Sequence, residues 1–591
     1  MTAPFGARTR AQFHHRATAF AVFAALAGLV GSRARAAALP ELMPIDDVKV
    51  GMKGVGRSVF RGDTIEEFGI EVLSVMHRTR PQGDLVLFRA EGEFLEHTGI
   101  IAGMSGSPVY IDGKLLGAIA FAYPNGKDPI GAITPAVEML PLLDADLSLP
   151  PREEQDGTLT TQLPTKDGDS RTAEPGASAG PRFEQLWSSF LTRSHESDPV
   201  AGTPEQDGAE LAPVSLPLSL SGWAAPLREE MQATLGNLGF TAMSSPGGGK
   251  PGDVPVKPLE PGSAVSLPLV MGDADLAAVG TVTYVDGDKI IAFGHPMVQA
   301  GRVAFPMGSA WIYGVIPNTG VSVKMGSSTG LIGAITNDRR TGIAGKVGPT
   351  PDMLPVRVAV REESGAWRQF HYQVVRQAAF TPFFLPWTVS NSYLATGWSM
   401  GDALLSTDCS VYFNGGRKIT RHESIASDSP SQAIGGDVAM PANLLLVNPF
   451  EKVRLDSVAV SIDYRRGIGN AKITEVRCTP VRAEVGDTLR VEVDIEPFRG
   501  ATQTKRVEIP ITGAWAGRRL RVLAASTQDF VEWDQDRAPE KFEPHSMRQM
   551  LEMITRVPDD ATFDRARLPL GRAARFARRE SSCPAFPRPP S

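Results

Sequence analysis

The residues with the clearest potential for chemistry are the serines of a glycine-rich stretch, Gly-Met-Ser-Gly-Ser-Pro at residues 103–108. Glycine permits positive φ angles, so such a loop can turn several backbone N–H groups toward one point. A serine hydroxyl beside that point would form a nucleophile with an oxyanion hole, the site that stabilises the negatively charged oxygen in acyl transfer. The same residue types also form ordinary tight turns, so this stretch alone leaves a purely structural interpretation open.

Short apolar segments on both sides of the serines would position them. Residues 109–111 and 114–120 flank Asp112-Gly113, a dipeptide typical of a type I′ turn, and predict a β-hairpin behind the loop. Residues 70–75 and 85–90 have the alternating or continuous apolar character of strands. We therefore expect a compact, β-rich module around the serine loop.

The whole chain is expected to be mainly β and divided into several domains. Its 591 residues exceed what one hydrophobic core holds, and its 59 Gly and 47 Pro favour short strands with many turns. Composition and patterning predict a signal peptide at 1–36, the module of the serine loop at 41–143, a low-complexity linker at 150–213, a second β-rich region at 259–440, an immunoglobulin-like β-sandwich at 453–523 and a basic tail at 560–591.

The first residues have the pattern of an export signal. Arg8, Arg10 and Arg16 precede an apolar run at residues 17–31, and Ala-Arg-Ala at 34–36 is a small-residue cleavage site. The run is too short and too rich in alanine for a typical membrane span, although a retained anchor is the alternative. We expect an exported protein, periplasmic or extracellular, with no stable membrane span after signal cleavage.

Charge and cysteine usage argue against several classes of function. The net charge is −6, so no basic field points to nucleic acid. Cys409, Cys478 and Cys583 are far apart and have no metal-ligand spacing. We expect no metal site and no cofactor, and the oligomeric state stays open.

Two blocks of the sequence resemble a known peptidase family. Residues 103–108 resemble the nucleophile loop of trypsin-like peptidases, Gly-Asp-Ser-Gly-Gly-Pro, and are more similar still to the SpoIVB peptidases, family S55, which residues 98–102 and 112–118 also resemble. A second block, residues 280–295 and 332–347, resembles the part of that family with its catalytic histidine. The resemblance spans roughly residues 43–143 and 259–347, and it implies a trypsin-like double β-barrel.

The resemblance implies roles for individual residues. Ser105 would be the nucleophile, His295 the general base, and the N–H groups of Gly103 and Ser105 the oxyanion hole. Glu91 aligns where the family has the aspartate of its triad, with Asp286 and Asp288 as alternatives near His295. Ser107 is expected to fill a small, hydrogen-bonded structural site. We interpret three further histidines as structural or surface residues: His77, His97 and His371.

The sequence departs from the family pattern in three ways. The histidine block precedes the serine block in the family but follows it here, and a permuted domain with residues 150–213 in the new connection would reconcile the two orders. Ala120 stands where the family has a threonine. Met104 stands where trypsin-like enzymes have the aspartate that pairs with a new N-terminal ammonium group, so activation by that ion pair is excluded.

Two hypotheses follow from these observations. The first is an exported serine endopeptidase that cleaves a protein substrate in the cell envelope or outside, through an acyl-enzyme. The second is a catalytically inactive binding or scaffold protein of the cell envelope on the same fold, motivated by the reversed order, by Glu91 and by the C-terminal sandwich.

Overall fold

The computed structural model describes residues 41–80, 83–123, 125–152, 211–236, 238–245, 257–362, 364–377, 380–397, 403–427, 430–466, 471–497, 500–517, 522–525 and 533–556. The predicted signal peptide, most of the linker and the basic tail lie outside these residues. In the part of the chain that is described, no helix has the length and apolar character needed to cross a membrane.

The serine loop belongs to a closed, six-stranded antiparallel barrel, here called barrel one. Its strands pair in the order β4-β1-β2-β3-β6-β5, and β4–β5 pairing closes the ring. Alternate side chains of β3 are buried, among them Val86 and Phe88, which pack with Ile70 and Ile119 in the barrel core. The elements are β1 (Lys53–Arg61), β2 (Thr64–Arg80), β3 (Gly83–Glu91), α1 (Glu93–Thr98), β4 (Pro108–Ile111), β5 (Lys114–Ala122) and β6 (Ile130–Pro135), with η1 (Ile45–Asp47) before them and α2 (Ala136–Met139) and η2 (Leu140–Asp144) after them.

A second barrel, barrel two, repeats this pairing scheme further along the chain. Its strands pair in the order β10-β13-β14-β15-β12-β11, and β10–β11 pairing closes the ring. In both barrels the first strand pairs with the second and fourth, the third with the sixth, and the fifth with the fourth and sixth. The prediction of a mainly β chain with a double-barrel core is confirmed. The strands are β10 (Ala264–Gly272), β11 (Asp275–Asp286), β12 (Lys289–Ala292), β13 (Gly301–Ile316), β14 (Val323–Arg339) and β15 (Gly342–Val347).

A short segment between the barrels starts at the end of the predicted linker, and its strands and helix were not predicted from the sequence. It contains β7 (Ala212–Pro213), β8 (Leu216–Ser221), α5 (Ala225–Gly236) and β9 (Phe240–Ser244). Strand β7 pairs with β5 of barrel one, whereas β8 pairs with β11 of barrel two and, in parallel, with β9. The chain therefore contacts both barrels as it passes from one to the other.

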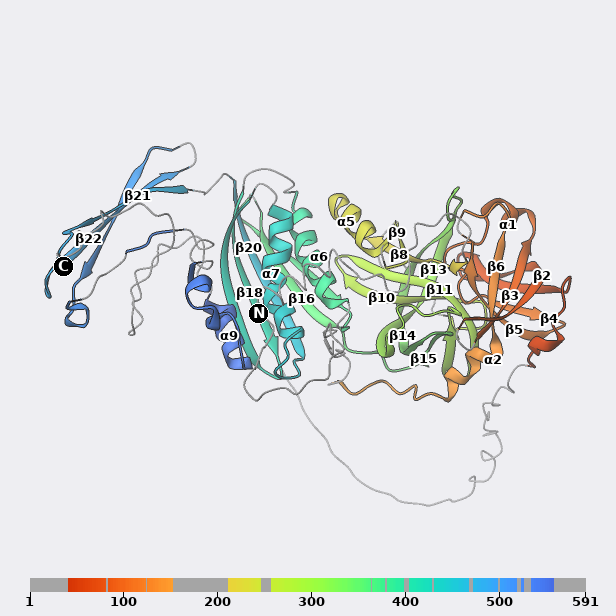
Figure 1. Ribbon diagram of the computed structural model, residues 1–591. Helices are drawn as coiled ribbons and strands as arrows, with labels where there is room; N and C mark the ends of the chain where they lie inside the picture. Colours follow the sequence, from red (N-terminus) through yellow and green to blue (C-terminus); the bar gives the residue numbers. More distant parts are fainter. Residues whose placement is uncertain are drawn as a thin grey trace, which may run out of the picture. The chain divides into compact units, whose positions relative to one another are not determined.

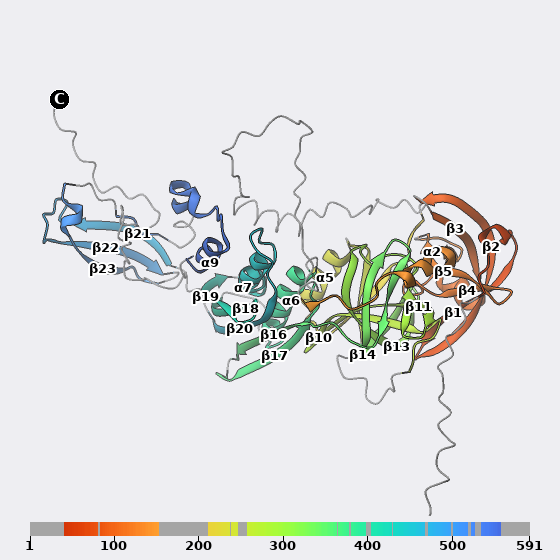
Figure 2. The ribbon, with the colours of Figure 1, turned by 90° about the horizontal axis from the view of Figure 1, so that it is seen from below.

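The sheet of barrel two continues into a helix-covered region (Figures 1 and 2). Strand β17 pairs with β10, and the order continues as β16, β20, β18 and β19. Aromatic residues of α6, including Phe384 and Trp387, join the apolar residues of α7 in one core with these strands. The elements are β16 (Leu354–Arg361), β17 (Trp367–Val374), α6 (Thr381–Leu394), β18 (Ala403–Phe413), β19 (Arg417–Ser427), α7 (Pro430–Leu446), β20 (Leu455–Arg466) and α9 (Met547–Arg556), which contacts β19 through the bond from Arg421 to the Ile554 carbonyl.

The segment predicted as a sandwich, residues 453–523, is divided between two sheets. Its first strand, β20, pairs with β16 and β18, so it belongs to the preceding sheet. The separate sheet has three strands, β21 (Ala471–Thr479), β22 (Thr488–Pro497) and β23 (Gln503–Pro510), followed by η3 (Gly513–Trp515) and, further on, η4 (Pro539–Lys541). The difference arises because alternation of apolar residues predicts a strand but does not specify its pairing partner.

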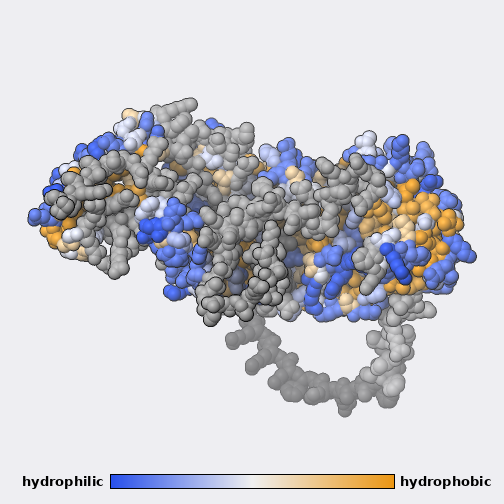
Figure 3. All heavy atoms as spheres, in the orientation of Figure 1, coloured by the Kyte–Doolittle hydropathy of each residue, from blue (hydrophilic) through white to orange (hydrophobic). Residues whose placement is uncertain are grey.

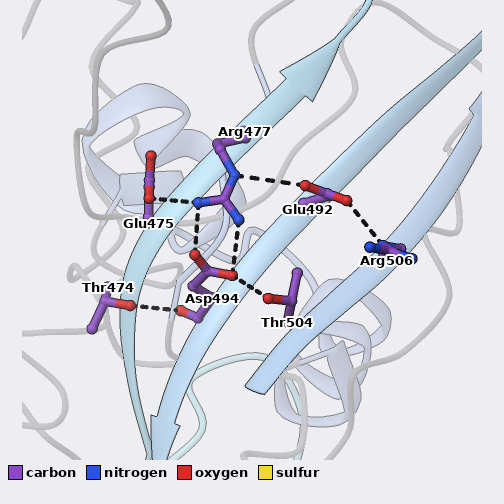
Figure 4. A network of polar contacts seen from close by, with 7 residues as sticks. All are labelled: Thr474, Glu475, Arg477, Glu492, Asp494, Thr504 and Arg506. Atoms are coloured by element: carbon purple, nitrogen blue, oxygen red, sulfur yellow. Dashed lines mark hydrogen bonds and ion pairs between the residues drawn. The ribbon is translucent and has the colours of Figure 1, made fainter. Parts of the chain in front are cut away.

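Charged side chains occupy one face of this three-stranded sheet (Figure 4). Arg477 on β21 donates to Asp494 on β22 at 2.7 Å, and Arg506 on β23 donates to Glu492 at 2.9 Å. Apolar residues such as Val491 and Val493 form a small core with Ile509. The alternation therefore gives the sheet one polar and one apolar face.

Barrel one carries a marked apolar surface. Figure 3 shows apolar residues gathered over this end of the molecule. Exposed apolar side chains of its chain segment include Val50, Phe94 and Val137, which are 72%, 45% and 59% exposed. The serine loop, by contrast, lies in the interior.

Candidate active site

The serine loop connects the third and fourth strands of barrel one, after α1. Gly103 and Gly106 have φ angles of +95° and +93°, and the Ser107 N–H donates to the Met104 carbonyl at 2.8 Å. A Cβ at Gly106 would lie 2.0 Å from the Thr281 carbonyl oxygen, so only glycine fits there. The glycine spacing is thus required by a tight turn against barrel two.

Two backbone N–H groups of the serine loop are available to donate hydrogen bonds. The N–H groups of Met104, Gly106 and Ser107 each donate to a backbone carbonyl. Those of Gly103 and Ser105 have no acceptor among the described residues. An oxyanion needs two such donors, and these are the two that the resemblance implies.

The histidine loop occupies the equivalent position in barrel two, between its third and fourth strands. Phe293 and Gly294, directly before His295, have φ angles of +72° and +70° and turn the chain sharply after β12. A left-handed φ is unusual for phenylalanine and costs on the order of 1 kcal/mol or more. The side chain of Phe293 is fully buried, and this packing holds the turn.

The structure brings Ser105 and His295 together. Ser105 Oγ lies 2.5 Å from His295 Nε2 and 2.7 Å from the Phe293 carbonyl oxygen. His295 Nδ1 lies 2.7 Å from the Pro296 carbonyl oxygen. Because a carbonyl only accepts, Nδ1 carries a hydrogen, and in the neutral ring Nε2 can accept the serine proton.

The same contacts also suit the charged ring. An imidazolium would donate from Nε2 to Ser105 Oγ, and the hydroxyl would then donate to the Phe293 carbonyl. The contacts therefore suit both the neutral and the protonated His295 ring while Ser105 keeps its hydroxyl hydrogen.

Both side chains are buried. Ser105 is 0% exposed and His295 is 3% exposed. The rings of Phe121 and Phe293 lie 6.4 Å and 6.3 Å from the imidazole, between ring centroids. Electrostatic interactions are strong in such surroundings, because little water screens them.

The structure does not bring Glu91 to the imidazole. Its carboxylate is 38% exposed and pairs with Lys53 on β1. Asp286 pairs in register with Lys289 across the β11–β12 hairpin, and the carboxylate of Asp288 is 3.5 Å from Lys346. Comparison of side chains along the sequence could not identify the partner of His295 Nδ1, because that partner is a backbone carbonyl.

Threonines of β11, not singled out from the sequence as site residues, hold the serine loop. The Thr281 hydroxyl donates to the Gly103 carbonyl at 2.9 Å, and the Thr283 hydroxyl donates to the Gly106 carbonyl at 2.8 Å. The Thr281 N–H also donates to the Ser105 carbonyl at 2.9 Å. The Thr-Val-Thr alternation was the available signal, since residues two apart in a strand face the same side.

A buried lysine of β14 lies behind the same loop. Lys324 is 1% exposed, and its Nζ donates to Ser58 at 2.7 Å and to Thr281 at 3.4 Å. Burial lowers the pKa of this amine to about 7. Ser107 donates to the same Ser58 at 2.9 Å, which is the kind of small hydrogen-bonded site expected for it.

A comparison with protein families matches the part of the chain that contains the serine loop to a peptidase family. The family described as SpoIVB peptidase S55 matches residues 15–131, which include the loop and its hairpin but end before His295. This part of the chain is therefore similar to a peptidase family. No curated protein and no solved structure matched the chain.

Proposed function

We propose that this protein is an exported serine endopeptidase of the SpoIVB type, which cleaves an extracytoplasmic protein through an acyl-enzyme. The observation that carries the proposal is the 2.5 Å contact between Ser105 Oγ and His295 Nε2, which joins residues 190 positions apart. The family match over residues 15–131 supports peptidase chemistry independently of that contact.

The chemistry follows from these atoms. His295 Nε2 removes the Ser105 proton while Oγ attacks the peptide carbonyl carbon, and the Gly103 and Ser105 N–H groups stabilise the resulting oxyanion. The imidazolium then donates its proton to the leaving amine as the C–N bond breaks. Water, deprotonated by His295, hydrolyses the acyl-enzyme and restores the Ser105 hydroxyl.

Two observations favour the inactive scaffold as a second candidate. Ser105 is fully buried, so a peptide can reach it only if covering residues move. The Nδ1 hydrogen also bonds a neutral carbonyl, which stabilises an imidazolium less than a carboxylate does.

A fluorophosphonate probe separates the two candidates, because it reacts with an activated serine. We expect the purified mature chain to be labelled, Ser105→Ala to lose labelling and casein cleavage, and His295→Ala to lose at least a hundredfold in rate. His97→Ala is the matched control, since His97 lies exposed on α1. Absence of labelling in the folded wild-type protein would favour the scaffold.

Export is part of the proposal and has its own measurement. The Arg-rich start, apolar run and Ala-Arg-Ala site of residues 8–36 support it. The mature protein should begin near Ala37 when recovered from outside the cytoplasm, as N-terminal sequencing would show.

A further inference from the structure

The contact at His295 Nδ1 raises the question of what orients the imidazole. The Pro296 carbonyl that accepts from Nδ1 belongs to the next residue of the same loop. Its position is therefore only as well defined as the backbone that follows it. A general base must be held close to its productive geometry, because small displacements cost rate.

That backbone is held by one carboxylate. Asp338, at the end of β14, accepts the Met297 N–H at 2.8 Å, the Val298 N–H at 2.9 Å and the Ala300 N–H at 3.1 Å. Both of its oxygens take part, Oδ1 with Met297 and Oδ2 with the other two. The segment after Pro296 is thus wound around a single side chain.

Asp338 and the backbone N–H groups that it binds form a buried clamp. Asp338 is 0% exposed, and its strand pairs it with Gly301, where β13 begins. Burial raises the pKa of this carboxyl, and the backbone N–H donors oppose that rise by stabilising the carboxylate.

A cavity of about 570 Å³ adjoins this clamp, with Asp338 and Gln299 in its lining. The charged groups that line the cavity with Asp338 are Arg339, Arg340 and Glu138, and the last two form an ion pair at 3.5 Å.

We propose that Asp338 is a positioning residue for His295, acting through the backbone of residues 296–300, and this inference rests on the proposed function. It takes over the orienting part that the sequence comparison had assigned to Glu91. The carboxylate does not contact the ring itself. It holds the backbone after Pro296 and thereby positions the Pro296 carbonyl. That carbonyl accepts from Nδ1 and so sets the tautomer and direction of the His295 ring.

The test measures how fast Ser105 is acylated by a fluorophosphonate, separating the maximal rate, kinact, from the probe affinity, KI. Asp338→Asn keeps the shape but replaces one acceptor by an amide that faces N–H groups. We expect kinact to fall on the order of tenfold or more while KI stays unchanged, because orientation is lost and the binding surface is not.

A second variant keeps the test decisive if Asp338→Asn fails to fold. Asp338→Glu retains the carboxylate on a side chain one methylene longer. Its kinact should lie between those of the wild type and Asp338→Asn, again at unchanged KI.

Asp275→Asn is the matched control. Asp275 is a half-buried carboxylate of barrel two that also accepts a backbone N–H, that of Gly272 at 3.1 Å, at the β10–β11 turn. It should lower the melting temperature without changing kinact. Equal kinact in wild type and the Asp338 variants, or a loss shared with Asp275→Asn, would overturn the inference, whereas an unlabelled wild type would overturn the proposed function instead.

Discussion

The two barrels have the same strand order but hold their key residues in different ways. Ser105 and His295 both lie between the third and fourth strands of their barrels. Because the two loops are topologically equivalent, their meeting does not depend on which barrel comes first in the chain. The order of the two loops along the chain is therefore no obstacle to the pair.

The difference lies in what supports each loop. The serine loop of barrel one is bonded to barrel two through Thr281, Thr283 and Lys324, in addition to the bonds that it makes within its own barrel. The histidine loop of barrel two is held by its own Asp338, and barrel one adds bonds from Thr134 to the Gly294 carbonyl and from Ser105 to the Phe293 carbonyl, each at 2.7 Å. The serine half of the site thus depends on docking of the barrels, and the histidine half on a local clamp.

The largest effect should come from disturbing that docking at Gly106. In Gly106→Ala the new methyl group would meet the Thr281 carbonyl oxygen at 2.0 Å and the Phe293 nitrogen at 2.4 Å, at a φ of +93°. We expect a loss of about 3 kcal/mol or more in the free energy of unfolding, and loss of probe labelling. Chemical denaturation and labelling measure the two effects.

Gly113→Ala is the control for Gly106→Ala. Gly113 also has a positive φ, +77°, but nothing lies within 4 Å of its Cβ position. It should cost only about 1 kcal/mol of backbone strain and leave labelling intact. Equal effects at the two glycines would contradict dependence on docking.

Lys324→Met should change how stability depends on pH. Because the pKa of Lys324 is about 7 when folded and 10.5 ordinarily, the folded state binds fewer protons than the unfolded state between these values. Wild-type stability should therefore gain up to about 1.4 kcal/mol per pH unit from this group as pH rises from 7 toward 10, and that gain should be absent in Lys324→Met.

Urea denaturation at pH 7, 8 and 9 measures this slope. Lys346→Met is the control, because Lys346 is a partly exposed amine of β15 paired with Asp288. If the unfolding free energy changes equally with pH in Lys324→Met, Lys346→Met and the wild type, the buried amine does not titrate between pH 7 and 9.

The smallest effects should come from single hydroxyl groups. Thr283→Val removes the bond to the Gly106 carbonyl, and Thr134→Val removes the bond to the Gly294 carbonyl. Each should cost about 1–2 kcal/mol, because a buried carbonyl loses its donor. If the serine loop depends more on docking, Thr283→Val should reduce the labelling rate more than Thr134→Val does.

Much of the fold could be predicted because its signals are local. The Asp112-Gly113 turn joins paired strands, as predicted. Strands expected at residues 70–75 and 85–90 are present within β2 and β3. The sandwich was misplaced because β20 has the same alternating pattern whichever sheet it joins.

The sequence by itself determined the serine loop, since glycines at 103 and 106 are required by positive φ angles and close contact. With the family resemblance it also pointed to His295, although no spacing rule joins two residues 190 positions apart. Only the tertiary structure showed that Glu91 pairs with Lys53, that the Pro296 carbonyl accepts from the imidazole, and that Asp338 holds the loop. The physical reason is that backbone carbonyls and N–H groups occur at nearly every residue, so their use in a site leaves no mark in the sequence until folding places a side chain beside them.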